Sequence, residues 1–396
     1  MILKNVSVLL GPELEYDSST NLQIYDQRFK HIKKNIHHSA QEETFDCEGL
    51  LVIPGLVNSH THIGDSIAKD VTLNDSVNEK IHPIFGAKSK ILKKTKPSQL
   101  ASFMQNTCKS MIRKGITTFV DFREGGIEGV QLLKQVMTKV PIRSIILGRV
   151  EYYQKPNQIR KNIDLPLEKR NDLSDIIKKC DGIGVSGANE NSNSILRHYS
   201  TTKKLRAIHS AETKESIQNS KSVTRKSETL RALQLKPHFL VHMTYASKSE
   251  LIIAAKKTRG IVICPRANGV MAEGIPDVKL MLKTRCIIAI GTDNVMINSP
   301  DIFREMDYLW KVTMAISKKR IDPKQILKMA TVNAGKILQK NIGMIKTGNL
   351  ADCVLIDKHS IDLDPIHNIH ASLVHRTSDS SIRAVMIGGK IVFGKI

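Results

Sequence analysis

The sequence predicts an α/β fold, a (β/α)8 TIM barrel with a small β-sandwich domain formed by the N- and C-terminal segments. Between residues 54 and 345, short apolar runs rich in branched residues alternate with longer segments of helical period. This alternation is typical of a barrel of parallel strands. Strand-like runs occur before this region and return after it. A length of 396 residues also suits one large barrel with a smaller satellite domain.

The predicted barrel strands have the length and branching of buried parallel strands. In chain order they are LVIPGLVNSH, GITTFVDF, IRSIILGR, GIGVSG, LRAIHS, HFLVHM, GIVICPR and CIIAIGTD. We expect helices at QLASFMQNTCKSMIRKG, which Gly115 would end, and at KSELIIAAKKTRG. A closing helix is predicted in DPKQILKMATVNAGKILQ, with Asp322 as its N-cap and Pro323 at its first position.

The β-sandwich domain is predicted to combine residues 1–53 with residues 346–396, which leaves residues 54–345 to the barrel. Its strand-like runs are MILKNVSVLL, LQIYD, LLVIPG, ADCVLID, RAVMIGG and KIVFG. Gly388 and Gly389 predict a tight turn between the last two runs.

The composition is that of an ordinary globular protein, with 41% hydrophobic and 25% charged residues. No stretch approaches the roughly 18 apolar residues that a membrane span needs. The first residues lack the pattern of a secretory signal, so we expect a cytoplasmic protein. The 6 cysteines are scattered and form no CxxC pair, which predicts reduced, mostly buried thiols.

The formal net charge of +22 raises the question of a polyanionic partner. The Lys and Arg residues are spread along the chain, however, and no aromatic residues are interleaved for base stacking. We therefore expect a solvated basic surface, no membrane or dedicated nucleic-acid partner, and a small-molecule substrate. The sequence shows no subunit interface, so a homo-oligomer is left open.

Candidate metal ligands stand at the C-terminal ends of predicted strands, the face where barrel enzymes assemble their sites. His60 and His62 end the first strand, and their spacing puts both side chains on one face. Asp293 ends the eighth strand, where a buried carboxylate would need a counter-ion such as a divalent metal. Each pattern alone has a structural explanation, a chance His pair or a helix N-cap.

Two further strands end in residues of the same kind. His209 ends the fifth strand, and Glu212 follows it as a candidate acid or base beside a metal. His242 ends the sixth strand, although a lone His among apolar residues is usually part of the core. If none of these residues were functional, several independent coincidences would have to fall at strand ends in the right order.

PGLVNSHTH, HSAET, the His of LVHMT and GTDN resemble the corresponding motifs of the amidohydrolase superfamily. VICPRANGVMAEGIPDV, MATVNAGKIL and GMIKTGNLADCVLID resemble its branch of cytosine deaminases, adenosylhomocysteine/methylthioadenosine deaminases and chlorohydrolases. The resemblance implies one divalent metal, Zn²⁺ or Fe²⁺, bound by His60, His62, His209 and Asp293. The fourth predicted strand, DGIGVSGAN, lacks the Lys that bridges two metals in other branches.

The resemblance also implies roles in catalysis for three residues. Asp293 would act as ligand and base, Glu212 would protonate a ring nitrogen, and His242 would hydrogen-bond the attacking hydroxide or the oxyanion. The predicted reaction is hydrolysis of a non-peptide carbon–nitrogen bond, the deamination of a small aminated N-heterocycle with release of ammonia. A cyclic amide hydrolase or a triazine-type chlorohydrolase is the alternative, and a non-catalytic basic nucleic-acid-binding barrel is a remote one.

The substrate is less well indicated. A loop of about thirty-five residues after HTHIGDS is expected to cover it, since the corresponding region does so in similar enzymes. Phe85 is its only large aromatic residue, which argues against a large nucleoside. The candidate substrate contacts, with the two arginines proposed to bind a carboxylate or phosphate, are Asp65, His82, Arg123 and Arg149.

Overall fold

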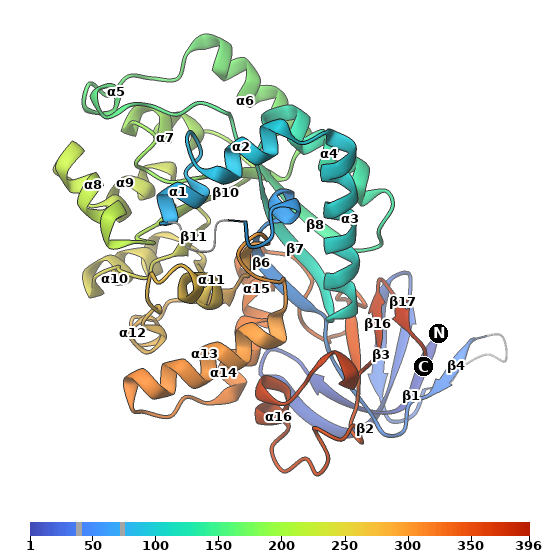
Figure 1. Ribbon diagram of the computed structural model, residues 1–396. Coiled ribbons are helices and arrows are strands. Elements are labelled where there is room, and N and C mark those ends of the chain that lie inside the picture. Colours follow the sequence, from blue (N-terminus) through green and yellow to red (C-terminus); the bar gives the residue numbers. More distant parts are fainter. Residues whose placement is uncertain (37–41, 72–75) are drawn as a thin grey trace.

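Two sheets organise the chain, a curled parallel sheet from the middle of the sequence and a second sheet from its two ends (Figure 1). The structure is a computed structural model that describes residues 1–36, 42–71 and 76–396. Within these ranges, no helix is long and apolar enough to cross a membrane.

The parallel sheet is the barrel. Its strands pair in chain order, and the last segment, β14, pairs in parallel with the first strand, β6. β13 and β14 are two parts of the eighth strand, so the sheet closes on itself as predicted. The strands are β6 (Leu56–His62), β7 (Ile116–Arg123), β8 (Arg143–Gly148), β9 (Gly182–Val185), β10 (Leu205–Ser210), β11 (Phe239–His242), β12 (Gly260–Ile263), β13 (Ile288–Ile290) and β14 (Asp293–Asn294).

The eighth strand is interrupted where it passes β6. The backbone N–H of Thr292 donates to the carbonyl of His60 at 3.1 Å. A Cβ added at Gly291 would lie 2.6 Å from the Cβ of His60. Only glycine allows this approach, and it brings the start of β14 beside the end of β6.

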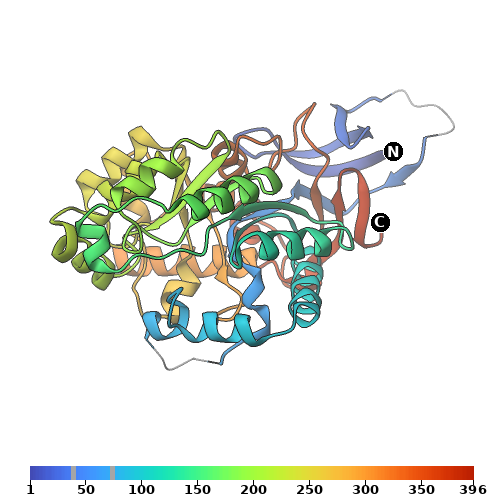
Figure 2. The same cartoon turned by 90° about the horizontal axis from the view of Figure 1, so that it is seen from above.

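Helices surround the barrel and connect its strands (Figures 1 and 2). The longer ones are α3 (Pro97–Arg113), α4 (Gly126–Met137), α6 (Leu167–Lys179), α8 (Lys214–Thr224), α10 (Lys248–Lys257) and α13 (Ile302–Ser317). The shorter ones are α5 (Pro156–Arg160), α7 (Asn193–Tyr199), α9 (Glu228–Ala232), η2 (Leu233–Leu235), α11 (Pro265–Val270), α12 (Val278–Lys283), α14 (Pro323–Met329), α15 (Val332–Leu338), α16 (Ile369–His375) and η3 (Asp379–Ser381).

The segment after β6, predicted as a covering loop, contains local structure. It forms η1 (Ile63–Ile67), α1 (Val77–Ile81) and α2 (Ala87–Lys94) before α3 begins. Residues 72–75 of this predicted loop lie outside the described residues. The turn between α1 and α2 lines the cavity at the mouth of the barrel, so this segment does cover it.

The second sheet joins the two ends of the chain, and both termini lie beside it (Figure 1). β5 pairs in parallel with β1 and antiparallel with β15. The strands are β1 (Ile2–Leu10), β2 (Glu15–Tyr25), β3 (Arg28–Lys33), β4 (Thr44–Asp46), β5 (Leu50–Pro54), β15 (Cys353–Asp357), β16 (Ile382–Ile387) and β17 (Lys390–Gly394). The predicted fold class is confirmed, whereas the domain boundaries at residues 53/54 and 345/346 stay a prediction.

Two predicted elements differ in detail. The run LVIPGLVNSH, expected as one barrel strand, divides at Gly55 into β5 of the second sheet and β6 of the barrel. The closing helix divides at Thr331, whose φ of −137° and ψ of −96° are not helical. Its start is as predicted, because the Asp322 carboxylate caps Lys324 N–H and Pro323 opens α14.

Smaller expectations also hold. Gly115 follows α3 with a φ of +75°, and Gly388 and Gly389 turn between β16 and β17 with φ of +57° and +75°. All six cysteines are buried free thiols.

Candidate active site

Four side chains from β6, β10 and β14 converge at the C-terminal end of the barrel. Nε2 of His60 lies 3.1 Å from Nε2 of His209 and 3.4 Å from Oδ1 of Asp293. Nε2 of His62 lies 3.5 Å from the same carboxylate oxygen. All four residues are buried.

Neighbouring groups orient the imidazoles. Nδ1 of His209 lies 2.9 Å from the carbonyl oxygen of Val185, and Nδ1 of His62 lies 2.8 Å from Oε1 of Glu124. Each Nδ1 therefore donates to an oxygen, which leaves the Nε2 lone pair facing the other members of the group. The ring of Phe122 packs edge-on against His60, with centroids 4.4 Å apart.

The protonation states suit a metal. Burial lowers the pKa of His60 and His209, and burial together with the charge of Lys88 lowers that of His62 to about 3. Burial opposes ionisation of Asp293, but the hydrogen bond and charge of His60 outweigh it and hold the carboxyl pKa below its ordinary value. The set therefore offers neutral imidazoles and a carboxylate near neutral pH.

These residues fit a divalent cation. Ligand atoms held tetrahedrally by zinc at 2.0–2.1 Å lie about 3.3 Å from one another, close to the separations found here. Oδ2 of Asp293 is buried without a hydrogen-bond partner among the described residues. Nitrogen and carboxylate ligands of this kind bind divalent metals in proteins.

Glu212 and His242 lie beside this group. Nε2 of His242 is 3.6 Å from Oε1 of Glu212 and 3.8 Å from Oδ2 of Asp293. Neither Nε2 nor Oε1 has a hydrogen-bond partner within the described part of the chain. Nδ1 of His242 lies 3.2 Å from Oδ1 of Asn268, which fixes the ring. The pair therefore presents two uncommitted polar atoms to the metal group.

The backbone is strained at two of these positions. His242 and Asp293 have φ of +70° and +62°, a left-handed conformation that costs residues with a Cβ about 1 kcal/mol or more. Such strain persists when surrounding structure holds it and clusters at functional sites. Here it turns both side chains toward the same point.

A cavity of about 120 Å³ opens onto these residues. His82 and Arg149, two of the predicted substrate contacts, line it. The His82 ring stacks on Phe85 with centroids 3.8 Å apart. Other lining residues come from the segments after β9 and β10, and they include Ser186, Gly187, Asn189, Glu190, Thr213, Ser216 and Glu228.

The other two predicted contacts, Asp65 and Arg123, do not line this cavity. The carboxylate of Asp65 accepts from the Asn294 amide at 2.6 Å and from the backbone N–H of Met296 at 3.1 Å. Arg123 is 4% exposed, and its guanidinium contacts Glu124 at 2.6 Å. Both side chains make buried interactions and lie outside the cavity lining, and their predicted role in substrate binding stays a prediction.

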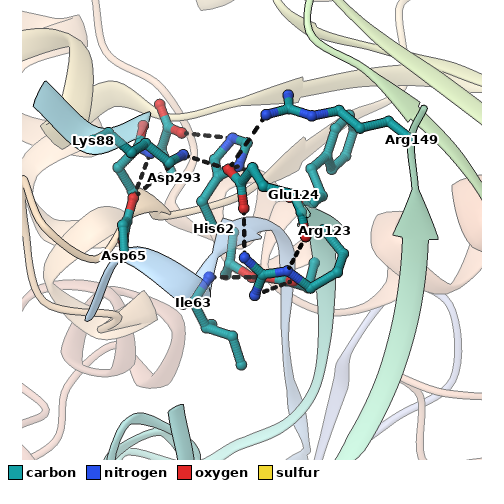
Figure 3. Close-up of polar contacts among 12 residues, drawn as sticks. His62, Ile63, Asp65, Lys88, Arg123, Glu124, Arg149 and Asp293 are labelled. Atoms are coloured by element: carbon teal, nitrogen blue, oxygen red, sulfur yellow. Dashed lines mark hydrogen bonds and ion pairs between the residues drawn. The ribbon is translucent and has the colours of Figure 1, made fainter. Parts of the chain in front are cut away.

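Glu124 is a site residue that the sequence reasoning missed. Its carboxylate forms ion pairs with His62 and Arg123 (Figure 3). It also lies 2.5 Å from the ammonium of Lys88 and 3.8 Å from the guanidinium of Arg149. Burial opposes its ionisation, but Lys88, His62 and Arg123 lower its pKa well below the ordinary value. Its position just after a predicted strand was a usable signal, the same one that identified the metal ligands.

Cys264 was also missed. Its sulfur lies with His60 and Asp293 in a group that would fit a metal ion. Burial raises the pKa of this thiol well above its ordinary value. We favour the imidazoles and Asp293, because the ligand atoms of His60, His62 and His209 also lie together in a group that would fit a metal ion.

The fold and this site define a barrel hydrolase. The amidohydrolase family model matches residues 51–392. The chain belongs to the amidohydrolase family and is an enzyme of that family, with a His/Asp site for a divalent metal.

Relatives and solved structures agree with this family. A putative aminohydrolase of Methanothermobacter thermautotrophicus is 35% identical over 398 residues, covering 99% of both chains. A 5-methylthioadenosine/S-adenosylhomocysteine deaminase of Thermococcus sibiricus is 25% identical over 407 residues, covering 99% of this chain and 93% of the relative. A zinc-bound adenosine deaminase from Xanthomonas campestris has a similar fold, with a TM-score of 0.82 at 17% identity over 98% of this chain and 92% of that one. Atrazine chlorohydrolase from Arthrobacter aurescens, also with zinc, has a TM-score of 0.85 at 14% identity over 99% and 95%.

Proposed function

We propose that this enzyme deaminates a small aminated N-heterocycle, nucleobase- or nucleoside-like, with release of ammonia. One divalent metal, zinc rather than iron, would be held by His60, His62, His209 and Asp293. The observation that carries the proposal is the uncommitted Glu212–His242 pair, 3.6 Å apart, on the cavity beside Asp293. Deaminases among the relatives, and the zinc bound in similar folds, support it.

When bound, a divalent metal lowers the pKa of water and supplies a hydroxide nucleophile at neutral pH. The carboxylate of Asp293 takes the proton that the attacking water gives up. Oε1 of Glu212 delivers a proton to the ring nitrogen next to the reacting carbon, which makes that carbon electrophilic. Nε2 of His242 hydrogen-bonds the attacking hydroxide or the oxygen that adds there.

The reaction balances without a further co-reactant. The ring carbon gains an oxygen from water, and its bond to the exocyclic nitrogen breaks. Asp293 passes the proton that it took from water to the leaving nitrogen, and ammonia departs. As the new hydroxyl group becomes a carbonyl, Glu212 takes its proton, so both carboxyl groups return to their starting states. Burial raises the pKa of Glu212 to about 7, which suits a group that must gain and lose a proton near neutral pH.

The decisive measurement is ammonia release by metal-loaded protein. The panel would hold cytosine, guanine, adenosine, 5-methylthioadenosine, S-adenosylhomocysteine, pterins and aminotriazines. We expect release from at least one compound and its loss in Asp293→Ala. Chloride release from a chlorotriazine, or ring opening of a cyclic amide, with no ammonia from the panel would replace deamination by the alternative chemistry.

A further inference from the structure

The cavity offers hydrogen-bond acceptors and no spare positive charge among its described lining residues. We infer that the substrate is uncharged or cationic, carries hydroxyl or amino donors away from the reacting carbon, and bears no carboxylate or phosphate. This inference rests on the proposed function, because it concerns the same cavity.

The two cationic side chains of the lining already face carboxylates (Figure 3). The ammonium of Lys88 lies 2.5 Å from Glu124 and 3.4 Å from Asp65. The guanidinium of Arg149 lies 3.8 Å from Glu124 and 3.7 Å from Glu151. An anionic substrate group would have to compete with these carboxylates for either cation.

His82 supplies no further charge there. Burial lowers the pKa of His82, the imidazole on the covering segment. Its Nδ1 also accepts from the backbone N–H of Ile84 at 3.2 Å. The ring therefore lines the cavity as a neutral group near pH 7 and does not attract an anion.

The acceptors come from Glu190, after β9, and Glu228, at the start of α9. A Cβ placed on Gly187 would lie 3.1 Å from Oε2 of Glu190 and 3.9 Å from Oε1 of Glu228. The two carboxylates therefore converge on one stretch of the lining. Together with Glu212 and Asp293, they give the cavity four carboxylate side chains.

The donors on these two carboxylates are neutral. Ser186 donates to Glu190 at 3.3 Å, and Ser216 and the backbone N–H of Ala211 donate to Glu228 at 2.7 and 3.0 Å. The buried Arg231 lies outside the lining and donates to Asn191 O and Asn193 Oδ1. Burial raises the pKa of both carboxyl groups, that of Glu228 to about 7. Hydroxyl or amino groups of a ligand match the remaining hydrogen-bonding capacity of Glu190 and Glu228, whereas a phosphate offers them no donor and is repelled by whichever of them is ionised.

Matched pairs of compounds test the inference. Adenosine and its 5′-monophosphate, and cytidine and its 5′-monophosphate, differ only in the anionic group. We expect kcat/KM for the nucleoside to exceed that for the phosphate ester by about 100-fold, because repulsion of an added negative charge discriminates against the ester. S-adenosylhomocysteine should likewise be a poorer substrate than 5-methylthioadenosine.

Variants test whether Glu190 and Glu228 cause the preference for the nucleoside over its phosphate ester. Glu228→Gln and Glu190→Gln keep an acceptor oxygen and remove an ionisable carboxyl group. Each should narrow the ratio of kcat/KM between nucleoside and phosphate ester by up to about tenfold. Glu168→Gln, on a side chain that is 81% exposed, serves as the matched control and should leave the ratio unchanged. A ratio that does not change in either cavity variant would overturn the assignment.

Failure of the inference and failure of the proposed function are distinguishable. Ammonia from the phosphate ester at an equal or higher rate overturns the inference and leaves deamination standing. Absence of ammonia from every compound counts against deamination, and calorimetric binding of the same pairs then decides the charge preference. Binding that is no tighter for the nucleoside than for its phosphate ester refutes the inference.

Discussion

The carboxyl groups of Glu212 and Asp293 lie close together, but their surroundings shift their pKa values in opposite directions. Burial raises the pKa of Glu212 to about 7, whereas imidazoles around Asp293 keep its pKa low despite burial. Such separation between neighbouring carboxyl groups assigns the one with the raised pKa as the proton donor and the other, an anion at rest, as the proton acceptor. The two roles proposed here follow from where each side chain lies.

Glu212→Gln should lose at least about 100-fold in kcat, because the amide cannot carry the proton. Metal content, measured by atomic emission, should stay at the wild-type level. Glu215→Gln, an exposed neighbour on α8, is the control. Wild-type turnover in Glu212→Gln would show that another group moves the proton.

Glu305 provides a test of pH-dependent stability. Burial raises its pKa to about 8, although Arg266 opposes this. The folded state then holds a proton that the unfolded chain releases near its ordinary value of 4.5, so its contribution to stability is full below pH 4.5 and is lost as pH rises through 8. Between pH 5 and 9, the free energy of unfolding of wild type should fall by up to about 4 kcal/mol relative to Glu305→Gln.

Urea titrations at each pH would measure this difference, with the exposed Glu128→Gln as control. Parallel pH curves for wild type and Glu305→Gln would mean that Glu305 is ionised in the folded protein throughout the range.

The direction of side chains at the strand ends explains which site residues could be predicted from the sequence and which could not. His60, His62, His209 and Asp293 were predicted because strand ends of a barrel share one face. Arg123 lies outside the cavity lining because successive strand residues point to opposite sides. Phe122 points inward against His60, so Arg123 points outward to Met104, and Glu124 is the residue that reaches the site.

The segment from η1 to α2, which covers the cavity, is linked to the metal group through Lys88. Lys88 of α2 is 5% exposed, and its ammonium contacts the carboxylate that orients His62. Removing the groups that orient a metal ligand typically changes metal affinity by 10–100-fold. Lys88 therefore connects coverage of the cavity with the orientation of a proposed ligand.

Lys88→Met should weaken metal binding by about tenfold, measured by competition with a chelator. It should also make the segment from η1 to α2 more sensitive to limited proteolysis. Lys90→Met, an exposed position on the same helix, should behave like wild type. Equal metal affinity in the two variants would mean that Lys88 does not influence the proposed metal ligands.

Element boundaries were harder to predict than element types. Residues 51–57, LVIPGLV, are uniformly apolar, and periodicity within them does not show that Gly55 transfers the chain from one sheet to the other. The break at Thr331 is similar, because helix-compatible residues continue on both sides. There the backbone carbonyl of Leu327 accepts from the Thr331 hydroxyl at 2.7 Å, a contact that local sequence does not indicate.

A partly buried ion pair joins the two sheets of the molecule. Arg143, at the start of β8, contacts Asp352, just before β15, through two hydrogen bonds of 2.7 and 3.0 Å. Asp352 also accepts from the backbone N–H of Gly388 at 2.7 Å. One carboxylate thus links the barrel, β15 and the β16–β17 turn.

Asp352→Ala should lower the free energy of unfolding by about 3 kcal/mol, because it leaves a partly buried guanidinium and a buried N–H without partners. Denaturant unfolding monitored by circular dichroism would measure it. Asp362→Ala, at an exposed position, is the comparison. An unfolding midpoint shared by the two variants would mean that the link contributes little.

The barrel was predictable at this scale because each strand pairs with the next one along the chain. The second sheet was predictable only as a set of strands. β5 pairs with β15 about 300 residues later, and no local pattern specifies a partner at that distance. The sequence therefore indicated the composite domain without its pairing.

That distant pairing also sets an order of events during synthesis. The ribosome releases β5 long before β15 exists, so a nascent chain carries an open strand edge through the making of the entire barrel. Open edges invite pairing with other chains. Arrest or premature termination before residue 353 would leave this edge permanently uncovered, and the product would be a substrate for chaperones and proteases whatever the state of its barrel.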